Sequence, residues 1–111
     1  MIFTSVKNIK SKTELSFFKE QINVYVRLLE VYCEKKSISM NVNDETDITE
    51  ELIKIGVISS LDEINELKTT LGTEYDRFIH AVRYAVENED AAKVVKKLSN
   101  YERKKMQKEA G

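Results

Sequence analysis

The chain has 111 residues, no proline, three glycines and a formal net charge of −1. This length suits one domain with a single core and leaves little room for an enclosed enzyme pocket beside it. The many helix-forming residues and the lack of proline predict an all-α fold. A single cysteine excludes an intramolecular disulfide. No apolar run approaches the ~18 residues of a membrane span and no secretory signal opens the chain, so we expect a cytoplasmic protein.

The first eleven residues are ambiguous between a short helix and an extended arm. Ser11 followed by Glu14 matches a capping box, in which the serine oxygen and the glutamate carboxylate each accept a free backbone N–H. We therefore expect one domain over residues 1–111, with residues 1–11 as an N-terminal arm and a long helix that begins near Lys12 and extends to Lys36.

The long helix is unusually apolar. Its apolar side chains cover roughly 220° of the helical wheel, against the ~100° of an ordinary surface helix. One stripe contains Leu15, Phe18, Ile22, Tyr25, Val26, Leu29, Tyr32 and Cys33, and a second beside it contains Phe17, Val24, Leu28 and Val31. Such a helix must be covered from two sides, so we expect it to lie at the centre of a bundle of about five helices.

Three shorter helices follow a loop that is rich in Asn, Ser and Asp. Asp47 with Glu50 opens a helix over residues 48–56, Ser60 with Glu63 opens the next, and Thr73 caps a third over 74–87. Gly56 and Gly72 stand where the first two end, because glycine adopts the left-handed conformation cheaply. We expect the first pair to pack on the long helix through Leu52, Ile53, Ile55, Val57, Ile58, Leu61, Ile64, Leu67 and Leu71.

The same pair resembles a helix-turn-helix in outline only. Its second helix carries Asp62, Glu63 and Glu66 before its first lysine, so it would repel DNA phosphates. A calcium loop over residues 41–52 fails because Thr46 and Leu52 occupy the positions of the turn glycine and the bidentate glutamate. One histidine and one cysteine are too few for an ordinary structural zinc site. We expect no metal and no cofactor.

Charge is uneven along the chain. Residues 41–90 hold thirteen acidic and four basic residues, a net of −9, whereas residues 91–111 hold seven basic and two acidic residues, a net of +5. A fifth helix is expected to begin at Asn88 or Asp90 and to fray at about 105–111. Its apolar stripe of Ala91, Val94, Val95, Leu98 and Tyr101 lies opposite its nucleic-acid candidates Lys93, Lys96, Lys97, Arg103 and Lys104.

Catalytic signatures are absent from the sequence. His80 is expected on the polar side of its helix, near Asp76, where an i, i+4 pair could orient the imidazole; a surface salt-bridged histidine is the favoured interpretation. Cys33 falls in the apolar arc and is interpreted as a packed residue rather than a nucleophile. Tyr84 is also expected on the polar side, as an interface residue.

We therefore predict a non-catalytic protein-interaction module, an accessory, assembly or inhibitory protein, that forms a homodimer. Its interaction candidates are Phe17, Val24, Leu28, Val31 and Tyr84. One alternative is a nucleic-acid-binding accessory protein that uses the basic C-terminal helix. Another is an inhibitor whose acidic middle region imitates nucleic acid. The sequence predicts no small-molecule substrate and no membrane association.

Overall fold

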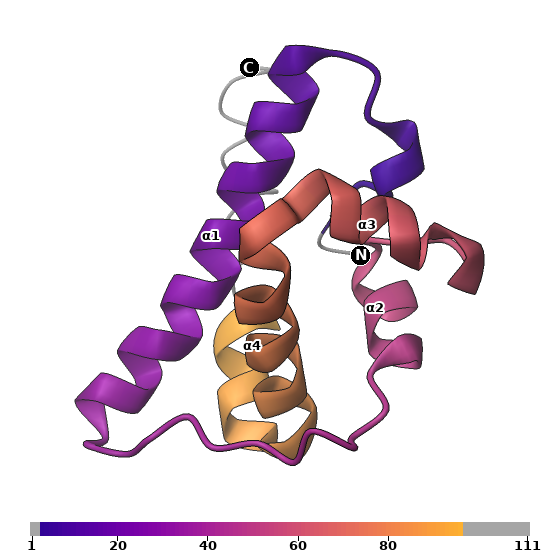
Figure 1. Ribbon diagram of the computed structural model, residues 1–111. Coiled ribbons are helices and arrows are strands. Elements are labelled where there is room, and N and C mark those ends of the chain that lie inside the picture. Colours follow the sequence, from indigo (N-terminus) through magenta and orange to yellow (C-terminus); the bar gives the residue numbers. More distant parts are fainter. Residues whose placement is uncertain (1–2, 97–111) are drawn as a thin grey trace.

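A single long helix, α1 (Lys12–Lys35), organises the computed structural model, which describes residues 3–96 of the chain (Figure 1). Its start matches half of the predicted capping box, because Ser11 caps the helix but Glu14 accepts from the residue before the N-cap. The Ser11 hydroxyl accepts the Glu14 N–H at 3.1 Å, and the Glu14 carboxylate accepts the Lys10 N–H at 2.9 Å. The Ser11 hydroxyl thereby satisfies one of the free donors in the first turn of the helix.

Three shorter α-helices follow α1 along the chain. They are α2 (Thr49–Ile55), α3 (Ile64–Leu71) and α4 (Tyr75–Glu87), with 3-10 turns η1 (Val6–Asn8), η2 (Leu61–Glu63) and η3 (Gly72–Glu74). A last helical segment begins at residue 89 and continues to the end of the described chain at 96. Residues 3–96 contain no strand, so the predicted all-α bundle around one long helix is confirmed. No helix in this part of the chain is long and apolar enough to cross a membrane.

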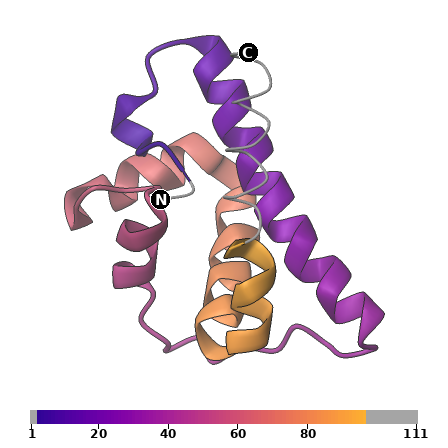
Figure 2. The ribbon, with the colours of Figure 1, turned by 180° about the vertical axis from the view of Figure 1, so that it is seen from behind.

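The helices are arranged in two groups (Figures 1 and 2). α4 packs against α1, and residues 89–96 turn back beside both. α2 and α3 lie on the other side of α4, and α3 also contacts η1. The segment between α1 and α2 crosses one end of the molecule as an extended loop, as the Asn-, Ser- and Asp-rich sequence predicts.

The predicted helix ends are mostly correct. The Asp47 carboxylate accepts the Thr49 N–H at 3.0 Å at the start of α2, and this hydrogen bond lowers the pKa of Asp47. Gly56, at φ 93°, ends α2 in the left-handed conformation. The prediction for Thr73 is wrong. Thr73 lies inside η3, and its side chain does not cap α4, because a 3-10 turn joins α3 to α4 without an intervening extended residue.

The core lies between α1, α4 and the α2–α3 pair. The largest side chains that are fully buried are Tyr25, Phe18, Phe78, Ile22, Leu29, Ile58, Leu67, Val57 and Val82. Tyr25 packs against Phe78 with ring centroids 5.5 Å apart. Two residues expected in the core face solvent instead. Ile53 is 40 % exposed and Leu61 is 60 % exposed, because each lies on the outer side of its short helix.

The N-terminal segment belongs to this core. Phe3 is 2 % exposed, and its ring lies 5.9 Å from Tyr25 and 6.1 Å from Phe78. Its backbone N–H donates to the Ile55 carbonyl at 2.9 Å, and the Val6 N–H donates to the Val57 carbonyl at 2.9 Å. Extended backbone up to Ser5 is followed by the short turn η1. Both conformations considered for this segment therefore occur in it.

A buried carboxylate ties this segment to the start of α3. Glu63 is 6 % exposed; it accepts the Ser5 hydroxyl at 2.6 Å and the Ser59 and Ser60 N–H groups at 2.9 Å each. Burial raises the pKa of Glu63, but these hydrogen bonds and nearby Lys7 outweigh it and lower the pKa overall. Glu63 is therefore ionised at neutral pH. Ser60 and Glu63 form the predicted capping box, and Ser5 is an additional partner 58 residues away.

Candidate protein-interaction surface

The second apolar stripe of α1 is exposed to solvent along part of its length. We call Phe17, Val24, Leu28 and Val31 the α1 stripe. Phe17 is 55 % exposed and Val24 is 38 % exposed, whereas Leu28 and Val31 are half-buried. Single exposed apolar side chains are ordinary on a protein surface, and a contact surface is indicated where several of them lie together.

The spacing within the α1 stripe is that of a helix–helix seam. With Gln21 included, the positions are separated by four, three, four and three residues, which is the heptad pattern of helices that pack side by side. The Gln21 side chain is buried, in contrast to its stripe neighbours. The arrangement suits a second helix laid along α1.

A pocket lies at the N-terminal end of this surface. Its volume is about 290 Å³, and it is lined by Thr4, Asn8, Ile9, Glu14, Phe17, Phe18 and Gln21. We call it the N-terminal pocket. Phe17 and Gln21 belong both to its wall and to the seam on α1, so the two features are continuous. The surface therefore combines an exposed helical ridge with a depression that could take a side chain of a partner.

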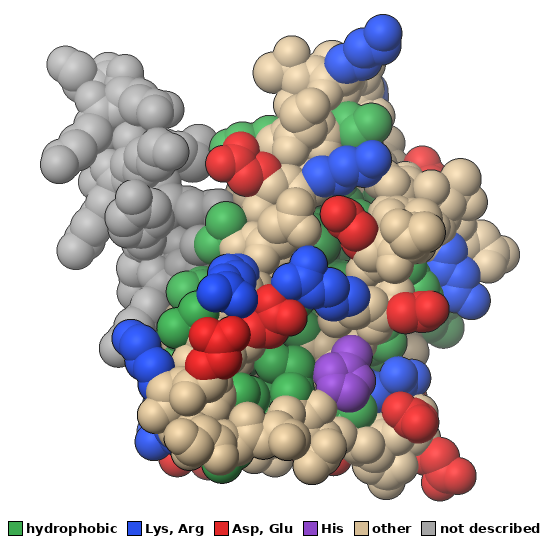
Figure 3. All heavy atoms as spheres, turned by 60° about the vertical axis from the view of Figure 1, so that its left-hand side comes forward, with side chains coloured by type: hydrophobic (Ala, Val, Ile, Leu, Met, Phe, Trp, Pro, Cys, Tyr) green, Lys and Arg blue, Asp and Glu red, His purple; other side chains and the backbone are tan. Residues whose placement is uncertain are grey.

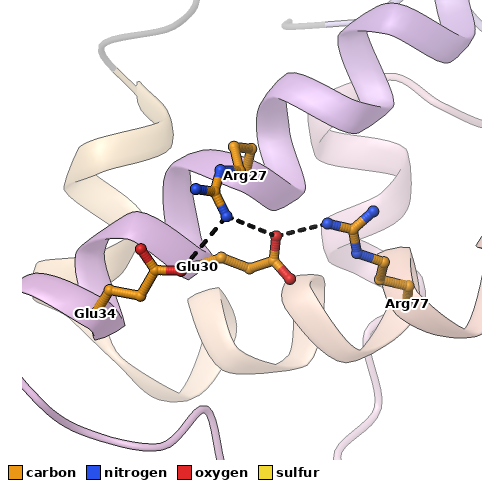
Figure 4. A network of polar contacts seen from close by, with 4 residues as sticks. All are labelled: Arg27, Glu30, Glu34 and Arg77. Carbon is orange, nitrogen blue, oxygen red and sulfur yellow. Dashed lines mark hydrogen bonds and ion pairs between the residues drawn. The ribbon is translucent and has the colours of Figure 1, made fainter.

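Charged residues border the polar side of α1 (Figures 3 and 4). Glu30 accepts from Arg77 of α4 at 2.6 Å, and Arg27 lies 3.8 Å from Glu30 and 3.4 Å from Glu34. Basic and acidic side chains are mixed on this face, with apolar side chains beside them. These exposed pairs contribute little to stability. They leave no large surplus of one sign of charge that would direct an oppositely charged partner to this edge.

Tyr84 does not belong to this surface, and its predicted place on the polar side of α4 is wrong. The residue is 4 % exposed. Burial, together with interactions with Cys33 and Tyr32, raises the pKa of Tyr84 to about 12. The physical reason is that Tyr84 lies on the side of α4 that faces α1, next to Cys33.

The polar face of α4 holds the loop between α1 and α2. His80 donates its Nε2–H to the Met40 carbonyl at 2.5 Å, and Arg83 Nε donates to the Thr46 carbonyl at 3.4 Å. The Glu87 carboxylate accepts the Asn43 N–H at 3.2 Å. All three side chains satisfy backbone groups of a loop that has little secondary structure of its own. His80 is thus a loop-binding residue.

A second depression lies beside this loop. It has a volume of about 370 Å³, and Asp44, Glu45 and Asp47 line one part of it while Leu52, Ile64 and Ile79 line another. Its acidic residues are spread along the loop. Within residues 3–96, no three His, Cys, Asp or Glu side chains are grouped so that they could hold a metal ion.

The nucleic-acid candidates are only partly described. Lys93 and Lys96 are exposed on the last helical segment, and Lys93 Nζ lies 3.8 Å from Asp90. Lys97, Arg103 and Lys104, and the expected frayed tail, lie outside the described residues. The segment does begin where the sequence predicted, since the Ala92 N–H donates to the Asn88 carbonyl at 3.0 Å.

Comparison with known proteins adds no family to this description. No protein-family model matches the chain, and no curated protein and no solved structure is significantly similar to it.

Proposed function

We propose that this protein is a non-catalytic interaction module that docks other helices on the α1 stripe, including α1 of a second copy. The observation that supports this most strongly is the exposure of Phe17 and Val24 at heptad spacing beside a pocket. Removing such side chains from water is favourable by about 25 cal/mol per Å² of apolar surface.

His80 and Cys33, the two residues considered for catalysis, are each engaged in contacts within the fold. His80 is engaged with the Met40 carbonyl, and Cys33 is buried between α1 and α4, next to Tyr84. A nucleophilic cysteine needs access and an electropositive neighbour. Neither residue supports an enzyme, and both fit a protein that acts by binding.

Self-association is the simplest use of the α1 stripe, because a two-fold axis brings identical stripes together. From Phe17 to Val31 the stripe is about 21 Å long at 1.5 Å per residue, and one helix is about 10 Å wide. This footprint is small compared with the ~800 Å² that each partner contributes to a standard interface. We therefore expect a dimer that dissociates on dilution.

The test is sedimentation equilibrium of the full chain over a range of concentrations, with the variants Phe17→Glu and Val24→Glu. A charge in the α1 stripe should raise the dimer dissociation constant at least about tenfold, which corresponds to 1.4 kcal/mol. The matched controls are Ile53→Glu and Leu61→Glu, which place the same charge on exposed apolar positions outside the stripe.

Circular dichroism must show unchanged helix content in all four variants. If self-association is equally strong in wild type and in both stripe variants, the stripe is not the docking surface and the proposal fails. If the stripe variants unfold, the second stripe belongs to the core of the monomer, which also contradicts the proposal.

A further inference from the structure

We infer that two copies of this protein pair through antiparallel α1 helices, about a two-fold axis beside Val24, with Glu20 of each copy against Arg27 of the other. This inference rests on the proposed function and deepens it, since it names the partner of the α1 stripe, the direction of the pair and the polar contacts that fix this direction. The order of residues along α1, the charges beside the stripe and the exposure of both support it.

The two ends of the α1 stripe lie at equal distances from Val24. Phe17 is seven residues before Val24 and Val31 is seven residues after it, so each lies about 10 Å from Val24 along the helix axis. In an antiparallel pair centred on Val24, Phe17 of one copy therefore meets Val31 of the other, and the two Val24 side chains meet at the axis. Phe17, the most exposed residue of the stripe, is covered in both copies by this arrangement.

Two opposite charges lie on the same side of the stripe. At 100° per residue, Glu20 and Arg27 fall about 40° and about 60° from Val24 around the helix, in the direction away from Leu28. Both residues are exposed to solvent. The Arg27 side chain is 60 % exposed although it lies 3.4 Å from Glu34 (Figure 4). An exposed pair of this kind holds an arginine weakly, so Arg27 can turn to a carboxylate of a second copy.

A two-fold axis at Val24 places these charges against each other. Glu20 precedes Val24 by four residues and Arg27 follows it by three, which corresponds to about 6 Å and about 4.5 Å along the helix axis. When the second helix runs in the opposite direction, its Arg27 therefore comes within about 2 Å of the height of Glu20, on the same side of the pair. The axis repeats this contact, so the dimer contains it twice.

A parallel pair lacks this match of charges. A two-fold axis along the helices brings the side that carries Glu20 and Arg27 against the other side of the stripe, where Leu28 is half-buried and Gln21 is buried. Each charge then faces an uncharged side chain and loses contact with water, which costs free energy. The placement of charges on α1 therefore favours the antiparallel direction.

The N-terminal pocket lies at each end of the antiparallel pair and carries a further charge. Its Glu14 is exposed, and its carboxylate is held by the Lys10 N–H at 2.9 Å. Glu14 is ten residues before Val24, and the exposed Lys35 is eleven residues after it. Lys35 of the second copy therefore comes to the height of Glu14, on the side of the stripe opposite to Glu20. Opposite charges thus meet at both ends of the pair as well as near its centre.

Charge-reversal variants of the full chain test the direction of the pair by sedimentation equilibrium. Glu20→Arg places two pairs of like charges in its own dimer, and Arg27→Glu does the same with the opposite sign. Each variant alone should raise the dimer dissociation constant about fivefold. An equimolar mixture of the two variants should associate about as tightly as wild type, because both contacts then join opposite charges. The matched control Glu66→Arg reverses an exposed charge on α3; it should not change self-association, and mixing it with Arg27→Glu should not restore the wild-type value.

Restored association in the mixture of Glu20→Arg and Arg27→Glu alone supports the inference. If this mixture stays as weak as the single variants while Phe17→Glu also weakens self-association, the pair has another direction. The inference is then wrong, and the proposed function stands. If wild type does not self-associate at any concentration, the inference and the proposed self-association both fail.

Cysteine cross-linking with a mild oxidant measures the direction independently. A disulfide requires Cα atoms within about 7 Å, so Phe17→Cys mixed with Val31→Cys should give a linked dimer of the two different chains, distinguished by an affinity tag on one of them. Phe17→Cys alone should give no linked dimer, since the two copies of this position lie about 21 Å apart along an antiparallel pair. Wild type, whose Cys33 is buried, measures the background. A linked dimer in Phe17→Cys alone would indicate a parallel pair and overturn the inference.

Discussion

The two apolar faces of α1 contain similar residues but meet different surroundings. Tyr25 and Leu29 on one face have no exposed surface, whereas Phe17 is 55 % exposed and Val24 is 38 % exposed on the other. The first face is covered by α4 and by Phe3 of the N-terminal segment, whereas the described residues leave the second face partly open. Burial is thus decided by tertiary neighbours, and an apolar residue without such neighbours indicates a place for a partner.

The largest difference in the free energy of unfolding should be found between variants that truncate one residue on each apolar face of α1. Leu29→Ala removes a fully buried side chain and should lower the free energy of unfolding by about 3–4 kcal/mol. Val24→Ala should lower it by less than about 1 kcal/mol, since much of this smaller side chain already contacts water. Urea denaturation of dilute samples measures both values. Equal losses would contradict the distinction between the two faces.

A smaller loss of stability is expected when the buried carboxylate of Glu63, which lies outside α1, is replaced. Glu63→Gln places an amide NH₂ or a single acceptor among the donors of Ser5, Ser59 and Ser60, so at least one donor loses its partner. The free energy of unfolding should fall by about 2 kcal/mol. The control Glu66→Gln changes an exposed acid on α3 and should stay within about 0.5 kcal/mol of wild type.

The same residue predicts a pH dependence with a definite sign. The pKa of Glu63 is lowered in the folded protein from its ordinary value of 4.5. Its contribution is therefore fully present above that value and is lost as the pH falls through the lower folded-state pKa. Denaturation measured from neutral pH down to pH values below this range should show a steeper loss of stability in wild type than in Glu63→Gln. Parallel curves would contradict this role.

The smallest predicted change is an increase in the free energy of unfolding. The Tyr25 hydroxyl is buried and has no hydrogen-bond partner among the described residues, and burial raises its pKa. Tyr25→Phe should therefore stabilise the protein by about 1 kcal/mol, because an unsatisfied polar group is removed from the core. Tyr84→Phe is the control, since the Tyr84 hydroxyl interacts with Cys33. A clear loss of stability in Tyr25→Phe would mean that its hydroxyl has a partner.

The sequence predicts those features of the fold that depend on residues close together along the chain. Ser11 with Glu14 and Ser60 with Glu63 cap helices within one turn, and Gly56 needs only its own freedom at positive φ. The buried face of α1 is also readable, because large apolar residues that recur at helical spacing are typical of a helix packed on a core.

What the sequence misses depends on distant contacts. The Ser5 hydroxyl donates to Glu63, which is 58 residues away in the chain, and no local sequence pattern predicts this hydrogen bond. Tyr84 is buried because it packs next to Cys33 of α1, and Leu61 is exposed because it lies on the outer side of the 3-10 turn η2. For the candidate site, the sequence identifies an excess of apolar surface on α1. It does not predict which part of this surface stays exposed, nor the pocket beside Phe17, because both depend on how η1 and α4 pack.

The most direct test of the central claim is an NMR dilution series of the wild-type chain, which follows backbone amide shifts as the concentration rises. If copies of the protein pair through the α1 stripe, the concentration-dependent shifts should gather at Phe17, Val24, Leu28 and Val31, and the amides of Ile53 and Leu61 should stay unchanged. Shifts that gather at Ile53 and Leu61, or an α1 stripe that does not respond while the protein self-associates, would contradict it.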